Sequence, residues 1–125
     1  MRPKIKNLEE LNTQIISCQK CKRLTTYINQ IAEKKVKRFK NETYWSKPVP
    51  SFGDPNAKIL LLGLAPGAHG ANRTGRIFSG DKSGQWLYKA LYEIGFSNQP
   101  ESISVIDGLK LENVWVSNVG RTVDI

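Results

Sequence analysis

The most constraining feature of the chain is the run from Gly63 to Asp81, GLAPGAHGANRTGRIFSGD, which directly follows the apolar stretch Ile59–Leu62. It contains five glycines, a proline, two arginines and His69, the only histidine of the chain. Glycines let backbone amides approach a ligand closely and permit positive φ angles. Open α/β sheets bind their ligands in loops at the carboxyl ends of strands. The run therefore predicts a binding or catalytic loop rather than a packing element.

Apolar patterning on either side of this loop predicts an α/β fold. Residues Lys58–Leu62 read as a strand buried on both faces, which is typical of parallel sheets. A helix is expected to begin at Asp81 or Ser83. Its apolar face would consist of Trp86/Leu87, Ala90/Leu91 and Ile94. Residues Val114–Val116 form a second β-rich run. Strand, loop, helix and strand make a βαβ unit, for which a right-handed crossover is expected.

One domain is expected over residues 1–125, with a helical segment at 1–40 and an α/β core at 57–125. Asn7 is positioned to cap the first helix, and a second helix is expected from about Arg23. Residues 41–56 contain three aromatic residues among prolines and a glycine. Aromatic side chains are costly to leave in water, so this segment is predicted to be an ordered loop.

The two cysteines, Cys18 and Cys21, form a C-x-x-C pair between the predicted helices. In an intracellular protein such a pair is usually half of a metal site or a redox pair. A redox pair normally ends a strand of a thioredoxin-like unit, whereas this one follows a helix, so a metal is favoured. A complete site needs four ligands, and the chain supplies two cysteines.

The net charge of +8 is concentrated in one stretch. Five basic residues fall within seven positions: Lys34, Lys35, Lys37, Arg38 and Lys40. This cluster is either a solvated helix end or a surface that contacts nucleic-acid phosphates. The sequence has no apolar run near the roughly 18 residues that a membrane span needs and no secretion signal at its start. An intracellular protein is therefore expected, in the cytoplasm of a prokaryote.

Phosphate binding by backbone amides at a helix N-terminus is the simplest chemistry for the glycine-rich loop. The spacings of the Walker A and dinucleotide-binding fingerprints are both absent from it. Nucleotide binding is therefore the less favoured interpretation.

The loop and the segment before it resemble the uracil-DNA glycosylase superfamily, in particular its family 5 branch of iron–sulfur, type b enzymes. The matching motifs are Tyr44-Trp45, Pro48-Val49-Pro50, Phe52-Gly53-Asp54-Pro55 and the run Gly63–Asp81. The resemblance extends from Cys18 to about Arg121 and implies a three-layer α/β/α fold with a central parallel sheet, of which this chain lacks the C-terminal part. It also implies an enzyme that flips uracil or another deaminated base out of DNA and hydrolyses the N-glycosidic bond, initiating base-excision repair as a monomer.

Roles for individual residues follow from this resemblance. Asp81 matches the family's candidate for activating water or stabilising an oxocarbenium-like sugar, with a helix N-cap as the alternative. His69 would contact the flipped base or hold the loop. The expected base pocket consists of Gly63, Leu64, Ala65, Pro66, Gly67, Phe78 and Asn118. In it Phe78 would stack on the base, or else be a core residue, and Asn118 would read the base edge, or else be a turn residue.

A second set of residues is expected either to fix the loop or to contact DNA: Asn72, Arg73, Arg76, Lys35, Lys37 and Arg38. Leu64 and Ala65 occupy positions at which other branches carry Asp or Glu, and neither side chain can transfer a proton. This departure is itself typical of family 5.

The resemblance also implies a 4Fe-4S cluster held by four cysteines. Cys18 and Cys21 match the first pair, whereas Thr122 occupies the position of the third and the fourth position lies beyond the sequence. Two alternatives to an active enzyme follow. One is a catalytically inactive remnant that still binds DNA, and the other is a metal site that two chains share.

Overall fold

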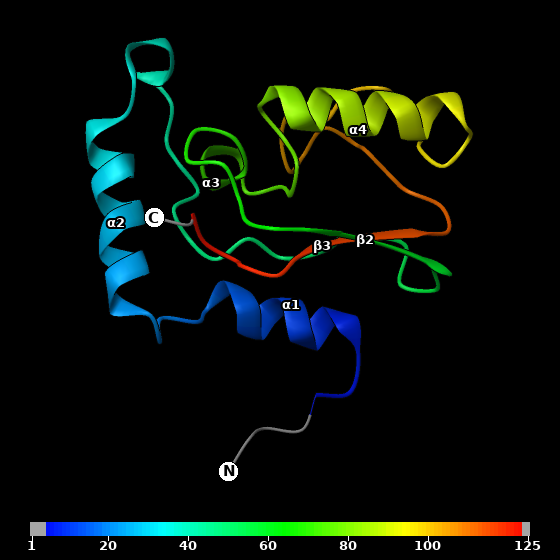
Figure 1. Cartoon of the computed structure of the whole chain (residues 1–125), viewed down its shortest axis with the longest axis horizontal. Helices are drawn as coiled ribbons and strands as arrows, with labels where there is room; N and C mark the ends of the chain where they lie inside the picture. Colours follow the sequence, from blue (N-terminus) through cyan, green and yellow to red (C-terminus); the bar gives the residue numbers. More distant parts are fainter. Residues whose placement is uncertain (1–4, 124–125) are drawn as a thin grey trace.

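The fold places a three-stranded sheet between helices (Figure 1). The structure is a computed structural model that describes residues 5–123. Its elements in chain order are α1 (Leu8–Ile16), α2 (Lys22–Lys34), the 3-10 helix η1 (Lys37–Phe39), β1 (Phe52–Gly53), β2 (Ile59–Gly63), α3 (Ala71–Thr74), α4 (Lys82–Glu93) and β3 (Val114–Asn118). Helix α4 lies over one face of the sheet and α1 along the other, while α2 stands beside the end at which α3 is found (Figure 1).

The sheet has the order β1-β3-β2, so β3 is its central strand. Strands β2 and β3 are parallel, with Ile59 opposite Val114 and Gly63 opposite Asn118. The short β1 pairs antiparallel with β3. The predicted α/β class is confirmed, and so is the pairing of the two predicted strands. The antiparallel β1 has no counterpart in the sequence prediction, because two residues are too few to produce a pattern.

The hydrophobic core lies between the sheet and α4. Val114 and Val116 of β3 pack with Tyr88 and Leu91 of α4, and all four are buried. The hydroxyl group of Tyr88 donates a 2.7 Å hydrogen bond to the carbonyl oxygen of Ile77. Burial raises the pKa of this phenol far above its ordinary value, so the group remains a neutral donor. The core thereby fixes the last part of the glycine-rich loop.

Strand β2 was predicted to be buried on both faces, and this prediction is wrong. Leu61 packs against the core, whereas Leu60 and Leu62 are each 61% exposed. The physical reason is that β2 lies at the edge of the sheet and α1 does not cover its outer residues. The predicted apolar face of α4 is confirmed at Leu91, which is buried, and at Leu87, which packs against the core. It is wrong at Trp86 and Ile94, which are 79% and 64% exposed, because the helix turns Gly84, Tyr88 and Leu91 inwards.

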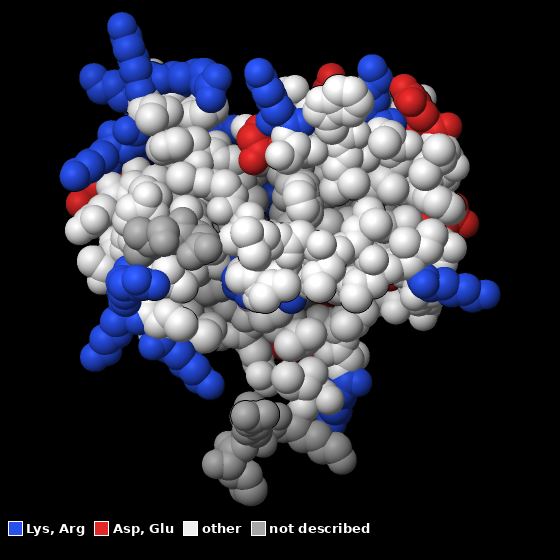
Figure 2. Space-filling view, viewed as in Figure 1, with Lys and Arg blue, Asp and Glu red and all other residues white. Residues whose placement is uncertain are grey.

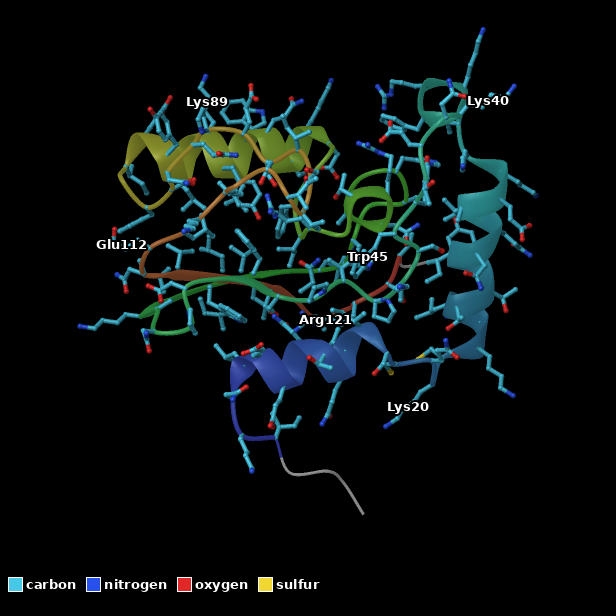
Figure 3. The ribbon with its side chains drawn as sticks, turned by 180° about the vertical axis from the view of Figure 1, so that it is seen from behind. Lys20, Lys40, Trp45, Lys89, Glu112 and Arg121 are labelled. Carbon is cyan, nitrogen blue, oxygen red and sulfur yellow. The ribbon has the colours of Figure 1, made fainter. Side chains whose placement is uncertain are left out.

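The predicted N-cap of α1 is confirmed, and polar side chains connect this helix and the C-terminal segment to the sheet. Asn7 Oδ1 accepts a 2.8 Å hydrogen bond from the Glu10 amide, as predicted. Asn12 joins α1 to the sheet through two 2.9 Å hydrogen bonds with the backbone of Ser51. Arg121 lies between α1 and the sheet (Figure 3). It donates 2.7 Å hydrogen bonds to the hydroxyl oxygens of Ser51 and Ser117, and burial lowers its pKa.

The segment 41–56 is an ordered loop, as its aromatic residues predicted. Tyr44 is buried, and the ring of Trp45 packs against the core. The Trp45 amide donates a 2.9 Å hydrogen bond to the carbonyl oxygen of Arg73, which ties the segment to α3. Within residues 5–123 we find no helix with the length and hydrophobicity that crossing a membrane requires.

Candidate active site

The ends of the two parallel strands bring Gly63, Phe78 and Asn118 together. Gly63 and Asn118 are opposite each other at the last positions of β2 and β3. A β-carbon on Gly63 would collide with both the Asn118 side-chain oxygen and the Phe78 ring. Only glycine therefore fits at this position without moving its neighbours. We call these three residues the base cluster.

Phe78 holds an unusual backbone conformation within the base cluster. Its φ is 53°, in the left-handed region, which costs a non-glycine residue about 1 to 3 kcal/mol. The side chain is half-buried and contacts the core. The contact with the core supports the alternative that Phe78 is a core residue, and the tip of its ring faces Gly63. Strain of this kind is often found at functional sites.

Asn118 supplies a polar atom without a partner. The residue is 4% exposed, and its Oδ1 accepts no hydrogen bond from the residues that the structure describes. Leaving a buried acceptor unpaired costs about 1 to 3 kcal/mol. A ligand that brings a donor to this oxygen would recover that free energy. Asn72 Oδ1, inside the glycine-rich loop, is likewise buried without a partner in residues 5–123.

Asp81 lies at the junction of the loop and α4. One carboxylate oxygen, Oδ1, accepts a 3.0 Å hydrogen bond from the Gly84 amide and so caps α4. The other, Oδ2, faces the turn at Gly67 and Gly70 so closely that a β-carbon on Gly67 would lie 2.9 Å from it. Asp81 therefore acts through Oδ1 as the N-cap that was the alternative prediction, while its Oδ2 is directed at the loop.

His69 is held by the segment before β1. Its Nδ1 lies 2.7 Å from the hydroxyl oxygen of Tyr44, and the two rings meet edge to face at 84°. Burial is the main cause that raises the pKa of Tyr44, so the phenol stays protonated. The histidine also lines a cavity of about 170 Å³ whose other walls come from α2 and Lys35. These contacts support the loop-holding alternative for His69.

Arg73 connects four segments of the molecule. Its Nε donates a 2.7 Å hydrogen bond to the His69 carbonyl oxygen, and its Nη2 donates a 3.2 Å bond to that of Gly80. Its Nη1 forms a 2.7 Å ion pair with Glu42. The guanidinium group lies 3.8 Å from the centre of the Phe39 ring in η1. Arg73 thereby fixes the backbone directly before Asp81 and attaches η1 to the loop.

Arg76 is buried, with an exposed side-chain fraction of 5%. Its Nη1 pairs with Asp107 at 2.5 Å, and its guanidinium group lies 4.6 Å from the centre of the Phe52 ring. These contacts attach the glycine-rich loop to the connection between α4 and β3. The sequence left two roles open for Asn72, Arg73 and Arg76, fixing the loop or contacting DNA. The contacts described for Arg73 and Arg76 are those of residues that fix the loop.

A basic groove runs beside Asp81. It has a volume of about 1000 Å³ and is lined by Arg38, Phe39, Arg73, Gly80, Asp81, Lys82, Gln85, Lys89, Pro100, Glu101, Ser102 and Ile103. Lys40 and Lys89 project on the same side of the molecule (Figure 3). The sequence prediction included Lys35, Lys37 and Arg38 but missed Lys82 and Lys89. Their spacing of seven residues, which places both on one side of a helix, could have indicated them.

The two cysteines lie in the turn between α1 and α2, and both are exposed free thiols. Within residues 5–123 no group of three or more His, Cys, Asp or Glu side chains is close enough to hold a metal ion. The two thiols therefore fit half of a four-ligand site and do not by themselves make a whole one.

Comparison with known proteins gives a consistent result. A family model described as "Uracil DNA glycosylase superfamily" matches residues 50–124. Three similar proteins each carry the name "Type-5 uracil-DNA glycosylase". The one from Thermus thermophilus is 50% identical over 107 residues, which are 86% of this chain and 48% of that protein. The one from Pyrobaculum aerophilum is 42% identical over 110 residues, 88% of this chain and 48% of that protein. The one from Mycobacterium tuberculosis is 44% identical over 108 residues, which are 86% of this chain and 40% of that protein. The chain thus spans about half the length of these relatives.

Proposed function

Because the chain belongs to the uracil DNA glycosylase superfamily, we propose that it hydrolyses the N-glycosidic bond of uracil in DNA, the first step of base-excision repair. The observation that carries this proposal is the base cluster. Its strained aromatic residue, its glycine without room for a side chain and its unpaired buried acceptor lie at the carboxyl ends of two parallel strands. Ligands of α/β proteins bind at such a place.

The base cluster offers both interactions that a flipped base needs. The face of the Phe78 ring would stack on a planar base. Oδ1 of Asn118 can accept a hydrogen bond from the N3–H group of uracil, and the side-chain NH₂ can donate one to a neighbouring carbonyl oxygen of the base. Cytosine presents an acceptor at N3 instead, so it would leave Oδ1 unpaired and bind less well.

In the reaction, the bond between C1′ of the sugar and N1 of uracil breaks, and its electron pair leaves with the base. Water adds to C1′ and loses a proton. Asp81 Oδ2 is the carboxylate oxygen beside the loop and would orient this water, accept its proton or stabilise the positive charge on the sugar. The backbone amides of residues 63–69 would stabilise the negative charge on the departing base.

The basic groove supports DNA as the partner. It opens beside Asp81 and combines Arg38, Lys82 and Lys89 with the aromatic ring of Phe39. The cations would neutralise phosphates, and the apolar wall would accommodate a sugar or base. A module that binds DNA without cleaving the bond would use the same groove, and only a measurement of base release distinguishes the two functions.

Binding in the groove should depend strongly on salt. The logarithm of the binding constant falls with the logarithm of the salt concentration by about 0.7 to 0.9 for each phosphate contacted. Arg38→Gln, at a residue of η1 that lines the groove, is expected to make this slope shallower by about one contact. The control is Lys20→Gln, which removes the same charge at the opposite end of α2 from Lys40 (Figure 3). Equal slopes for both variants would show that η1 does not contact DNA.

Release of uracil from a synthetic oligonucleotide, single- or double-stranded, tests the proposed function. The chain is expected to release uracil, and Gly63→Ala to slow release by about 10- to 100-fold, because the added methyl group collides with Asn118 and Phe78 at a cost of about 1 to 3 kcal/mol. Gly95→Ala is the control. Its β-carbon would meet no atom within 4 Å, but its positive φ strains the backbone, so this variant shows the effect of a loss of stability alone. Absence of release from both strand forms would contradict the proposal for this chain.

We also propose that Cys18 and Cys21 are two of the thiolate ligands of a 4Fe-4S cluster. Support comes from the C-x-x-C spacing and from the exposure of both thiols. The other two thiolates would have to come from a second polypeptide segment. The pair lies in the turn between α1 and α2, so a cluster here would join these helices to that segment and serve the structure.

A further inference from the structure

A small cavity lies between the C-terminal part of α2 and the glycine-rich loop, and we call it the α2 cavity. Its volume is about 170 Å³, and its walls are Tyr27, Gln30, Ile31, Lys34, Lys35 and His69. It shares no wall residue with the basic groove. Sites for drug-sized ligands have about 300 to 1,000 Å³, whereas one water molecule occupies about 30 Å³. The α2 cavity therefore fits one small chemical group rather than a whole nucleotide.

The walls of the α2 cavity carry positive charge. Lys34 and Lys35 contribute two ammonium groups, and none of the six wall residues is an aspartate or a glutamate. Figure 2 shows the Lys and Arg side chains that gather where α2 passes into η1, at the upper left. Neighbouring cations without a carboxylate between them repel each other, and an anion in the cavity would relieve this repulsion. The chemistry of the walls thus favours an anion over a metal cation.

The backbone of Lys35 gives a second, independent observation. Lys35 ends α2 with a φ of 53°, in the left-handed region that glycine usually occupies at the end of a helix. This conformation is unfavourable for a residue with a β-carbon, and such strain is often found at functional sites. The Lys35 ammonium group lies 6.0 Å from the centre of the Tyr44 ring, and Tyr44 is buried. A fixed aromatic residue therefore helps to position this lysine.

Tyr44 also determines which nitrogen of His69 is available to a ligand. Its hydroxyl oxygen lies 2.7 Å from Nδ1. Burial is the main cause that raises the pKa of this phenol, so the hydroxyl group keeps its proton and can donate a hydrogen bond to Nδ1. The ring proton of the neutral imidazole then lies on Nε2, which has no hydrogen-bond partner in residues 5–123. His69 thereby offers an N–H donor at the wall of the α2 cavity.

We propose that the α2 cavity binds a single phosphate group, held by the ammonium groups of Lys34 and Lys35 and by the Nε2–H group of His69. A phosphate has the negative charge and the several acceptor oxygens that these donors require. The phosphate belongs either to a DNA strand, in which case the site rests on the proposed function, or to a free ion. With DNA, the basic stretch Lys34–Lys40 would make two separate contacts, because Arg38 lines the basic groove instead.

Nuclear magnetic resonance of the imidazole nitrogens tests the proposal, because His69 is the only histidine of the chain. Inorganic phosphate, added at constant pH and ionic strength, is expected to shift the Nε2 resonance until the site is saturated. Lys34→Gln and Lys35→Gln should each weaken this binding by about three- to tenfold, because each removes one charged contact. Lys22→Gln removes the same charge from the first turn of α2 and should leave the affinity unchanged.

An oligonucleotide without uracil distinguishes the two sources of phosphate. If it shifts the Nε2 resonance and inorganic phosphate competes with it, then the phosphate belongs to DNA. If only inorganic phosphate shifts the resonance, then the site takes the free ion.

Two results would overturn the proposal. One is an Nε2 resonance that neither inorganic phosphate nor the oligonucleotide shifts. The other is an equal affinity of the unaltered chain, Lys34→Gln and Lys35→Gln for phosphate, since the ion would then bind elsewhere. None of these measurements uses uracil release, so the phosphate site can fail while the glycosylase proposal stands, and the reverse is also possible.

Discussion

Asp81→Asn is expected to slow uracil release by about 10²- to 10⁴-fold, the usual contribution of a positioned acid or base. Asparagine caps helices as well as aspartate does, so the hydrogen bond from the Gly84 amide and the start of α4 should survive. What the substitution removes is the negative charge of Oδ2 beside the glycine turn. The measurement is the single-turnover rate of base release at saturating enzyme, which excludes effects on DNA binding.

Two comparisons separate catalysis by Asp81 from its capping role. Glu93→Gln removes the same charge at the other, exposed end of α4 and should leave the rate unchanged. Asp81→Ala should additionally lower the free energy of unfolding by about 1 kcal/mol, because the cap is lost. If Asp81→Asn releases uracil at the rate of the unaltered chain, then Asp81 is an N-cap and another group activates the water.

Arg76→Met is expected to lower the free energy of unfolding by about 3 to 5 kcal/mol, the usual cost of removing one partner of a buried ion pair. Exposed side-chain fractions are 5% for Arg76 and 10% for Asp107, so the remaining carboxylate would be buried without its partner. Urea denaturation at pH 7 measures the change. Glu112→Gln, at an exposed position, is the control and should change stability by less than about 0.5 kcal/mol.

The same pair gives a dependence on pH. Burial would raise the pKa of Asp107, but hydrogen bonds from the Ile103 amide and from Arg76 outweigh it and lower the pKa below its ordinary value near 4. A depressed pKa contributes stability that is fully present above the unfolded-state value and is lost as the pH falls through the folded-state value. Asp107→Asn should therefore remove part of the loss of stability seen below about pH 4. An identical acid dependence with and without Asp107 would contradict this assignment.

Local signals in the sequence were sufficient for much of the fold. The apolar runs predicted β2 and β3, and the resemblance to the uracil-DNA glycosylase superfamily placed Gly63 and Asn118 in one pocket. Asp81 was predicted at the start of α4 because aspartate is a common N-cap. The predictions of the strands and of the cap depend on residues within one element, whereas the prediction of the pocket depends on the resemblance.

Other features depend on partners that are distant in the sequence, and these were not predicted. Arg73 pairs with Glu42, and Arg76 with Asp107, each 31 residues away. No local pattern identifies such partners, so the roles of both arginines stayed open. The prediction that β2 is buried on both faces failed for a related reason. An apolar strand is buried only if neighbours cover it, and the sequence of the strand does not say which neighbours it has.

The close approach at Gly63 also limits how this site can change in evolution. The space of a β-carbon at this position is already taken by Asn118 from β3 and Phe78 from the loop. A larger residue at position 63 becomes possible only when a smaller side chain replaces one of the other two. Enlargement at position 63 alone is therefore blocked, and related sequences that keep this backbone and carry a larger residue at 63 should carry a smaller side chain at 78 or 118.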